Sequence, residues 1–137
     1  MYPPELVQPM REELTAVGFS ELLSATDVES ALAQAGTTLV VVNSICGCAA
    51  ANARPGVRYS LANENTPDQL VTVFAGVDVE STTAARDRML PFPPSSPSIA
   101  LFKDGELVHM IERHHIEGRP AELIAENLKG AYDAHCA

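Results

Sequence analysis

The chain is poor in basic residues. Of its 137 residues, 9 are Lys or Arg and 18 are Asp or Glu, which gives a formal net charge of −9. A negative field of this size repels phosphate backbones, so we expect no nucleic-acid partner. The chain also lacks a continuous apolar run of about 18 residues, so we expect no transmembrane helix and no membrane partner.

The N-terminal segment has no basic stretch followed by an apolar one, which is the pattern of a secretory signal peptide. This favours the cytoplasm, where structural disulfides are rare. Cysteine is scarce and odd in number: there are 3, and Cys46 and Cys48 are separated only by Gly47. In a reducing compartment, such a close pair indicates catalysis or metal binding rather than a structural cross-link.

What is present is typical of a globular protein, with 46% hydrophobic and 20% charged residues. The length suits a single domain over residues 1–137, and we expect a monomer or a weak dimer. A helix is predicted to begin at Pro4, with an apolar stripe that includes Leu14, and to stop near Gly18. A short edge strand over 19–24 and a helix capped by Thr26, with Glu29 reaching back to the cap, are predicted to follow.

Three β-branched or apolar runs, residues 38–43, 70–75 and 98–102, predict buried strands. Residues 49–61 are predicted to be helical, with a kink near Pro55. Asp104-Gly105 indicates a hairpin whose return strand occupies 106–113, and a last helix is predicted after Pro120. This order of elements predicts an α/β three-layer sandwich with a mixed central sheet, flanked by helices, and an additional N-terminal helix.

Cys46 is predicted to lie where a buried strand meets a helix N-terminus, which carries a partial positive charge. No acidic residue occurs over residues 30–63, and this stretch also contains Arg54 and Arg58. Both features lower a thiol pKa below its usual value of about 8.5. Regular helical geometry would point Cys46 and Cys48 apart, so we expect Gly47 to adopt an unusual backbone conformation that lets the two sulfurs form a transient disulfide.

Alternatives remain open from the residues alone. One alternative to a redox pair is that Cys46 and Cys48 are two buried side chains without a chemical role. Another is a metal site, although the two cysteines supply two ligands where four are usual. Cys136 is interpreted as a thiol in a frayed tail, with an intermolecular partner as the alternative. His114 and His115 are interpreted as solvated side chains, with metal binding or proton relay as the alternative.

The segment 42–50, which contains Cys46-Gly47-Cys48, together with Ala53-Arg54-Pro55 and the opening segments 10–15 and 18–19, resembles the bacilliredoxin family over nearly the whole chain. The resemblance implies a thioredoxin-like fold. It also implies a reaction that removes bacillithiol, a cysteinyl-glucosaminyl-malate thiol, from mixed disulfides on client proteins. Bacillithiol would be a co-substrate, and no bound cofactor or metal is expected.

Carried over to this sequence, the resemblance makes Cys46 the attacking thiol and Cys48 the resolving thiol, with free bacillithiol as the alternative resolving agent. Pro97, which precedes the strand at 98–102, matches the cis-proline that faces the cysteines in the thioredoxin fold, and the loop 91–97 should line the substrate groove. Arg54 and Arg58 are candidates to orient the malate end of bacillithiol. The alternative activities are a general thioredoxin-type disulfide reductase or isomerase and a module that holds a soft metal or cluster.

Overall fold

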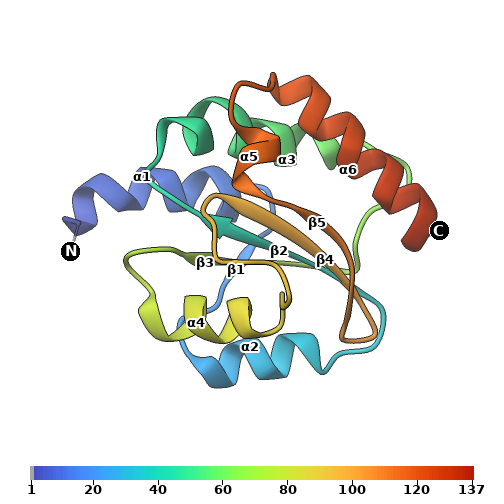
Figure 1. The fold of residues 1–137 in the computed structure, drawn as a ribbon, viewed down its shortest axis with the longest axis horizontal. Coiled ribbons are helices and arrows are strands. Elements are labelled where there is room, and N and C mark those ends of the chain that lie inside the picture. Colours follow the sequence, from blue (N-terminus) through green and yellow to red (C-terminus); the bar gives the residue numbers. More distant parts are fainter. Residues whose placement is uncertain (1) are drawn as a thin grey trace.

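The computed structural model describes residues 2–137, which form a mixed five-stranded sheet with helices on both faces (Figure 1). The helices are α1 (Pro4–Thr15), α2 (Ala25–Leu32), α3 (Arg54–Ser60), α4 (Val79–Asp87), α5 (Arg113–Ile116) and α6 (Ala121–His135), and a π-helical turn, η1 (Ala49–Ala53), precedes α3. The strands are β1 (Ser20–Glu21), β2 (Thr37–Asn43), β3 (Gln69–Phe74), β4 (Ser98–Lys103) and β5 (Glu106–Ile111). The predicted three-layer architecture is confirmed.

The strand order across the sheet is β1-β3-β2-β4-β5. β2 runs parallel to β3 and antiparallel to β4, and β5 runs antiparallel to β4. All seven residues of β2 are buried, as its largely β-branched run without alternation predicts for a strand covered on both faces. The carboxyl ends of β2, β3 and β5 therefore lie at one end of the sheet, where the loops that follow them meet.

Alternation along the strands divides the core into two layers. Leu39 and Val41 of β2 pack with side chains of α1, α3 and α6 on one face. Val40 and Val42 pack with side chains of α2 and α4 on the other. Figure 1 shows this division, with α1, α3 and α6 above the sheet and α2 and α4 below it. None of the described helices is long and apolar enough to cross a membrane.

Local capping differs from the sequence prediction at α2. The helix begins earlier than expected, because Ser24 rather than Thr26 is the N-cap. Ser24 Oγ accepts a hydrogen bond from the Asp27 N–H at 3.1 Å, while Asp27 Oδ2 accepts one from the Leu23 N–H at 2.9 Å. The overlapping Ser24 and Thr26 patterns compete, and the serine satisfies a first-turn donor while Thr26 lies within the helix.

The predicted kinked helix at 49–61 is divided into two pieces. Residues Ala49–Ala53 form the π-turn η1, and Pro55 occupies the first turn of α3, where the lack of an N–H is tolerated. The short helix α5 is absent from the sequence prediction, which extends the last strand to 113. A four-residue helix carries too little periodicity to be separated from the strand before it.

Gly56 sets the distance between α3 and α6. A Cβ at this position would lie 2.7 Å from Cγ2 of Ile124 and 3.1 Å from the carbonyl oxygen of Ala121. We expect Gly56→Ala to lower the free energy of unfolding by about 1–2 kcal/mol, because overpacking outweighs the helical preference of alanine. Urea denaturation measures this change.

Gly130→Ala is the matched control, since Gly130 lies in α6 and a Cβ there meets no atom within 4 Å. This variant should be as stable as the wild type or up to about 1 kcal/mol more stable. If both glycine variants unfolded at the same urea concentration, close approach of the two helices would not be what Gly56 provides.

Candidate active site

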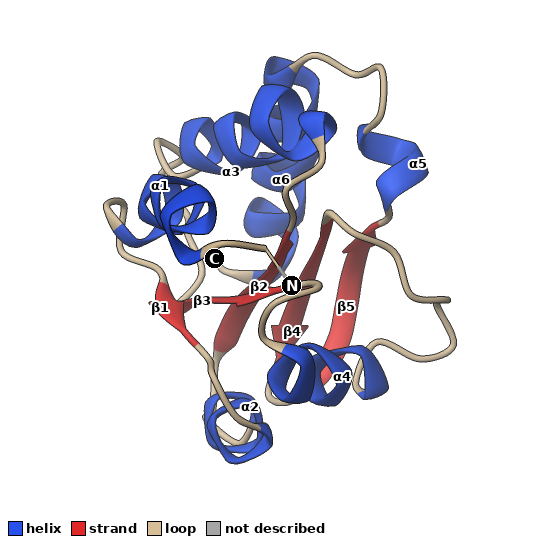
Figure 2. Cartoon of the chain, turned by 90° about the vertical axis from the view of Figure 1, so that its left-hand side faces the viewer, coloured by secondary structure: helices blue, strands red, loops and turns tan. Residues whose placement is uncertain are grey.

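Three segments converge where β2 ends. Val42 of β2 is paired with Ser98 of β4, so the loop that ends at Pro97 enters the sheet beside the loop that leaves β2. Ile99 of β4 is paired with Ile111 of β5, which brings Arg113 to the same end. Figure 2 shows the loops after β2 and β5 and the loop before β4 at this common end of the sheet. Cys46 and Cys48 lie in the loop that follows β2.

The two sulfurs are adjacent. Cys46 Sγ and Cys48 Sγ are 2.6 Å apart, and both thiols are free. The N–H of Cys46 donates to Ser44 Oγ at 3.1 Å, and its carbonyl oxygen accepts the Ala49 N–H at 2.9 Å. The turn that opens the π-helical segment therefore holds Cys46 and Cys48 on the same side.

The expectation that Gly47 adopts an unusual backbone conformation is wrong. Gly47 is not among the residues with positive φ, and Cys48 has ordinary right-handed helical angles. A Cβ at position 47 would meet no atom within 4 Å. Gly47 is exposed. Gly47 therefore leaves this exposed position of the turn without a side chain.

The surroundings separate the two thiols electrostatically. The pKa of Cys46 is lowered, first because the Cys48 thiol donates a hydrogen bond to its sulfur, then because of the backbone N–H of Cys48 and the charge of Arg113. The pKa of Cys48 is raised, first by burial and then by the neighbouring Cys46 sulfur. Cys48 also packs against the core beneath α3 and α6. Cys46 is therefore the thiol of the pair that ionises more readily, and Cys48 is the one that keeps its proton to higher pH.

Arg113 is the cation at this site that the sequence analysis missed. Its Nη1 donates to the carbonyl oxygen of Ser96 at 3.3 Å, and its side chain forms an ion pair with Glu117. Its charge lowers the pKa of both Cys46 and Cys48. A signal exists in the topology: β5 points the same way as β2, so a basic residue just after β5 must lie near the residues just after β2.

Arg54 is placed differently from the expectation that it orients a ligand. Its side chain is 1% exposed, so in this conformation no anion from solvent reaches it. Its Nη1 donates to Asn43 Oδ1 at 3.0 Å and to the Ser44 carbonyl oxygen at 2.9 Å. Its Nε lies 3.1 Å from Glu13 Oε2 of α1. Arg54 therefore fixes the Asn43 side chain and the Ser44 backbone, in the segment that leads from β2 to Cys46.

Asn43 completes this buried connection. It is 1% exposed, its Nδ2 donates to the Met10 carbonyl oxygen of α1, and its Oδ1 also accepts the Ser44 N–H. Arg58, by contrast, is exposed in the last turn of α3. The cation that lowers the Cys46 pKa is Arg113, rather than Arg54 or Arg58.

Pro97 directly precedes β4 at the end of the sheet where the loop with Cys46 and Cys48 leaves β2. The peptide bond between Ser96 and Pro97 is cis, and Pro97 is buried. The segment before it is tied to α5, because the Arg113 N–H donates to Ser95 Oγ at 3.4 Å in addition to the contact with Ser96. Arg113 thus joins the loop that ends at Pro97 to the two thiols.

Cys136 lies at the other end of the sheet. Its thiol interacts with Thr37, the first residue of β2, and burial raises its pKa. It is half-buried and packs against the core, so the interpretation as a thiol in a frayed tail is wrong, although the thiol is free. Because the whole length of β2 separates Cys136 from Cys46, it cannot serve as a third ligand or a resolving thiol within one chain.

Among the described residues, the cluster of potential metal ligands consists of Glu112, His114 and His115, and it includes neither thiol of the pair. The Glu112 carboxylate accepts the backbone N–H of His115, while His115 Nδ1 accepts the N–H of Glu112 at 3.1 Å. These contacts make a reciprocal cap for α5. His114 is exposed, as expected.

Known structures share this architecture. The chain superposes on a mutant thioredoxin from Halobacterium salinarum NRC-1 with a TM-score of 0.60 and 18% identity, over 85% of this chain and 89% of that one. Thioredoxin from Fasciola hepatica gives a TM-score of 0.60 and 20% identity, over 85% and 99%. The fold is thus thioredoxin-like, and a close thiol pair at this end of its sheet defines a thiol–disulfide redox protein.

Sequence comparison gives the family. A family model described as "Disulphide isomerase" matches residues 2–136. A bacilliredoxin of Cytophaga hutchinsonii is 57% identical over 133 residues, which are 97% of this chain and 98% of that protein. A bacilliredoxin of Shouchella clausii is 55% identical over 136 residues, covering 98% and 94%. The chain belongs to the bacilliredoxin family.

The buried contacts of Arg54 should contribute more to the free energy of unfolding than its charge does. We expect Arg54→Met to lower the free energy of unfolding by about 2–4 kcal/mol, because the Asn43 side chain and the Ser44 carbonyl lose their donor in a buried place. The matched control, Arg58→Met on the exposed face of the same helix, should change stability by less than about 0.5 kcal/mol. Equal stability of the two variants in urea would contradict the structural assignment of Arg54.

The two thiols should differ in reactivity toward alkylation. At pH values below the usual thiol pKa, iodoacetamide should modify Cys46 before Cys48, as peptide mass spectrometry would detect. The rate should rise with pH through a midpoint below that of an ordinary thiol, because the thiolate is the reactive form. Arg113→Gln should move this midpoint to higher pH, since a charge that favours the thiolate is removed. Preferential labelling of Cys48 would reverse the assignment.

Proposed function

We propose that the protein removes bacillithiol from mixed disulfides on oxidised client proteins, with Cys46 as the attacking thiol. The observation that carries the proposal is the pair of sulfurs 2.6 Å apart with pKa shifts in opposite directions. A thiol that ionises readily beside one that stays protonated is the arrangement required when the first thiol attacks a disulfide and the second later resolves the adduct. Membership of the bacilliredoxin family supports the choice of bacillithiol as the group transferred.

In the first step, the Cys46 thiolate attacks the bacillithiol sulfur of the mixed disulfide. A bond forms between Cys46 Sγ and that sulfur, the bond to the client sulfur breaks, and the client leaves as a thiolate that takes up a proton. The client is thereby reduced and Cys46 is oxidised. The backbone N–H of Cys48 and the charge of Arg113, which stabilise the Cys46 thiolate, also favour its return as a leaving group.

In the second step, Cys48 loses its proton and attacks Cys46 Sγ. The Cys46–Cys48 disulfide forms, and bacillithiol leaves as a thiolate. Once Cys46 carries the adduct it is no longer an anion, so its contribution to the raised Cys48 pKa is removed and Cys48 ionises more readily. A second molecule of bacillithiol that attacks the adduct is the alternative route. Both routes belong in the reducing cytoplasm, where free thiols persist.

A general disulfide reductase or isomerase is the second candidate function. The description of the matching family model as a disulphide isomerase favours it. Such an enzyme would form mixed disulfides directly with client proteins, and its rate would not depend on bacillithiol. A metal- or cluster-delivery module is the weaker candidate, because the third cysteine lies at the far end of β2 from the pair.

The test is loss of the adduct from a bacillithiolated model protein, followed by mass spectrometry. Wild type should remove it, and Cys46→Ala should reduce the rate to that of the buffer alone. Cys48→Ala should accumulate a bacillithiol adduct on Cys46, because the first step remains and the resolving thiol is gone. Cys136→Ala is the matched control and should behave as wild type.

An unchanged rate in Cys46→Ala would reject Cys46 as the attacking thiol. Protein–protein mixed disulfides in place of the bacillithiol adduct on Cys48→Ala would favour the reductase or isomerase. Zinc or iron that copurifies in stoichiometric amount and blocks alkylation of both Cys46 and Cys48 would favour the metal module.

A further inference from the structure

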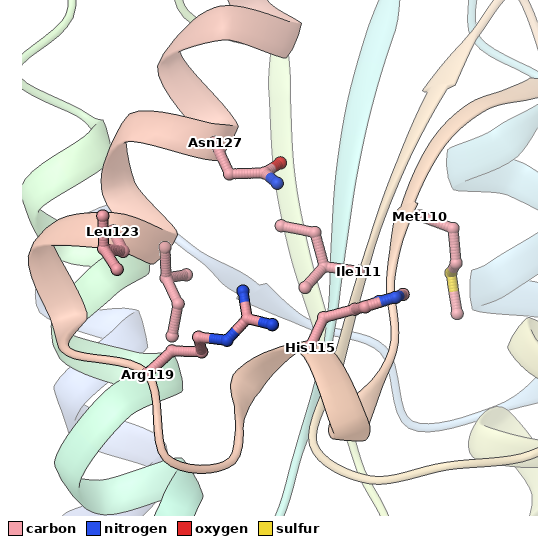
Figure 3. Close-up of a pocket in the computed structure, with 7 residues that line it drawn as sticks. Met110, Ile111, His115, Arg119, Leu123 and Asn127 are labelled. Atoms are coloured by element: carbon pink, nitrogen blue, oxygen red, sulfur yellow. The ribbon is translucent and has the colours of Figure 1, made fainter.

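A pocket lies beside the active end of the sheet, between β5, α5 and the first turns of α6. Its volume is about 150 Å³. Its walls combine apolar side chains, including Met110 and Ile111 of β5, with three polar ones, His115, Arg119 and Asn127. Figure 3 shows the Arg119 guanidinium extending into the space between Ile111 and His115, with the Asn127 amide facing it from α6.

The polar side chains of this pocket are arranged to receive an anion. None of the residues that line it is acidic. Within residues 2–137, no carboxylate lies within 4.0 Å of the Arg119 guanidinium, whereas Arg113 is paired with Glu117. His109 Nε2 donates to Asn127 Oδ1 at 2.6 Å, which fixes the amide and leaves its Nδ2 protons for a ligand. Arginine presents paired N–H groups that match a carboxylate.

The pocket adjoins the thiols. The carbonyl oxygen of Arg119 accepts a hydrogen bond from Asn52 Nδ2 of η1, the turn that follows Cys48. Glu117, two residues before Arg119, acts electrostatically on Cys48. His115 belongs to the same short helix as Arg113, whose charge reaches both sulfurs. A small molecule attached to Cys46 therefore has this pocket within its surroundings.

We propose that this pocket binds the carboxylate-bearing end of a small anionic thiol while its sulfur is bonded to Cys46, with Arg119 as the specificity-determining residue. The proposal rests on the proposed function, since it takes bacillithiol as that thiol and its malate group as the anion. A cavity of about 150 Å³ accommodates a short diacid but not a peptide segment. Arg119 is exposed, so an anion from solution can reach its guanidinium.

The pocket acts by holding the small thiol while the disulfide bonds are exchanged. When the Cys46 thiolate takes the bacillithiol sulfur from the client, the bond to the client sulfur breaks and the client thiolate leaves. The small thiol stays anchored at its carboxylates until Cys48 attacks Cys46 and releases it as a thiolate. Arg119 neither donates a proton nor bonds to sulfur in this sequence, so its effect belongs to binding rather than to chemistry.

Direct binding tests the pocket independently of turnover. The probe is S-methyl bacillithiol, which cannot exchange, titrated into reduced wild-type protein with amide chemical shifts as the readout. We expect shifts at the amides of Arg119, Ile124 and Asn127, and about tenfold weaker affinity in Arg119→Gln, as loss of a charge-assisted pair predicts. Arg88→Gln, an exposed arginine that ends α4 on the opposite face, is the matched control and should bind as wild type.

S-methyl cysteinyl-glucosamine, which lacks the malate, should bind about tenfold more weakly to wild type and equally to wild type and Arg119→Gln. Shifts confined to other surfaces, or equal affinity of Arg119→Gln and wild type for S-methyl bacillithiol, would overturn the proposal. Binding in the pocket without turnover of a bacillithiolated client would instead reject the proposed function and leave the pocket assignment standing.

Turnover supplies the second comparison, with one client protein that carries either bacillithiol or uncharged mercaptoethanol in its mixed disulfide. Arg119→Gln should raise KM for the bacillithiol adduct about tenfold with kcat unchanged, and it should leave both constants unchanged for the mercaptoethanol adduct. Equal losses on both adducts would mean that Arg119 has only a structural role. An unchanged KM for the bacillithiol adduct would likewise overturn the assignment.

Discussion

The active end of the sheet depends on one buried cation. The guanidinium of Arg54 joins the last residue of the central strand, the backbone of the next residue and the N-terminal helix, all with almost no exposure to solvent. A charge in such a place is costly unless it is paired and hydrogen-bonded, so its partners are held in one geometry. The turn that places Cys46 next to Cys48 begins from this fixed point.

The turn that follows the segment held by Arg54 gives the two cysteine side chains pKa shifts in opposite directions. Cys46 receives hydrogen bonds from the thiol and the backbone N–H of Cys48, while Cys48 sits against apolar side chains of the core. The difference arises from position in one turn rather than from any dedicated base. The N-terminal helix contributes as well, because Met10 and Glu13 hold Asn43 and Arg54.

The fold was accessible from sequence because its strongest signals are local. The β-branched run of β2, the turn at Asp104-Gly105 and the proline at 97 each specify backbone geometry within a few residues. The thiol pair was accessible for the same reason. The electrostatics were not, because charge density along the chain is a poor guide to charge density in space. The acid-free stretch around Cys46 suggested that Arg54 and Arg58 govern the thiols, yet Arg54 is neutralised by Glu13 from another helix, and the effective cation, Arg113, comes from a distant part of the sequence.

Arg113 is shared between a fixed acid, Glu117, and the Cys46 sulfur, whose ionisation its charge favours. When the Cys46 thiolate becomes part of a disulfide, one negative charge disappears beside this arginine while the rest of the surface stays the same. The oxidised state therefore presents a more positive face at the end of the sheet than the reduced state does. Under the proposed function, an anionic reducing thiol would be attracted more strongly by the disulfide form than by the dithiol form.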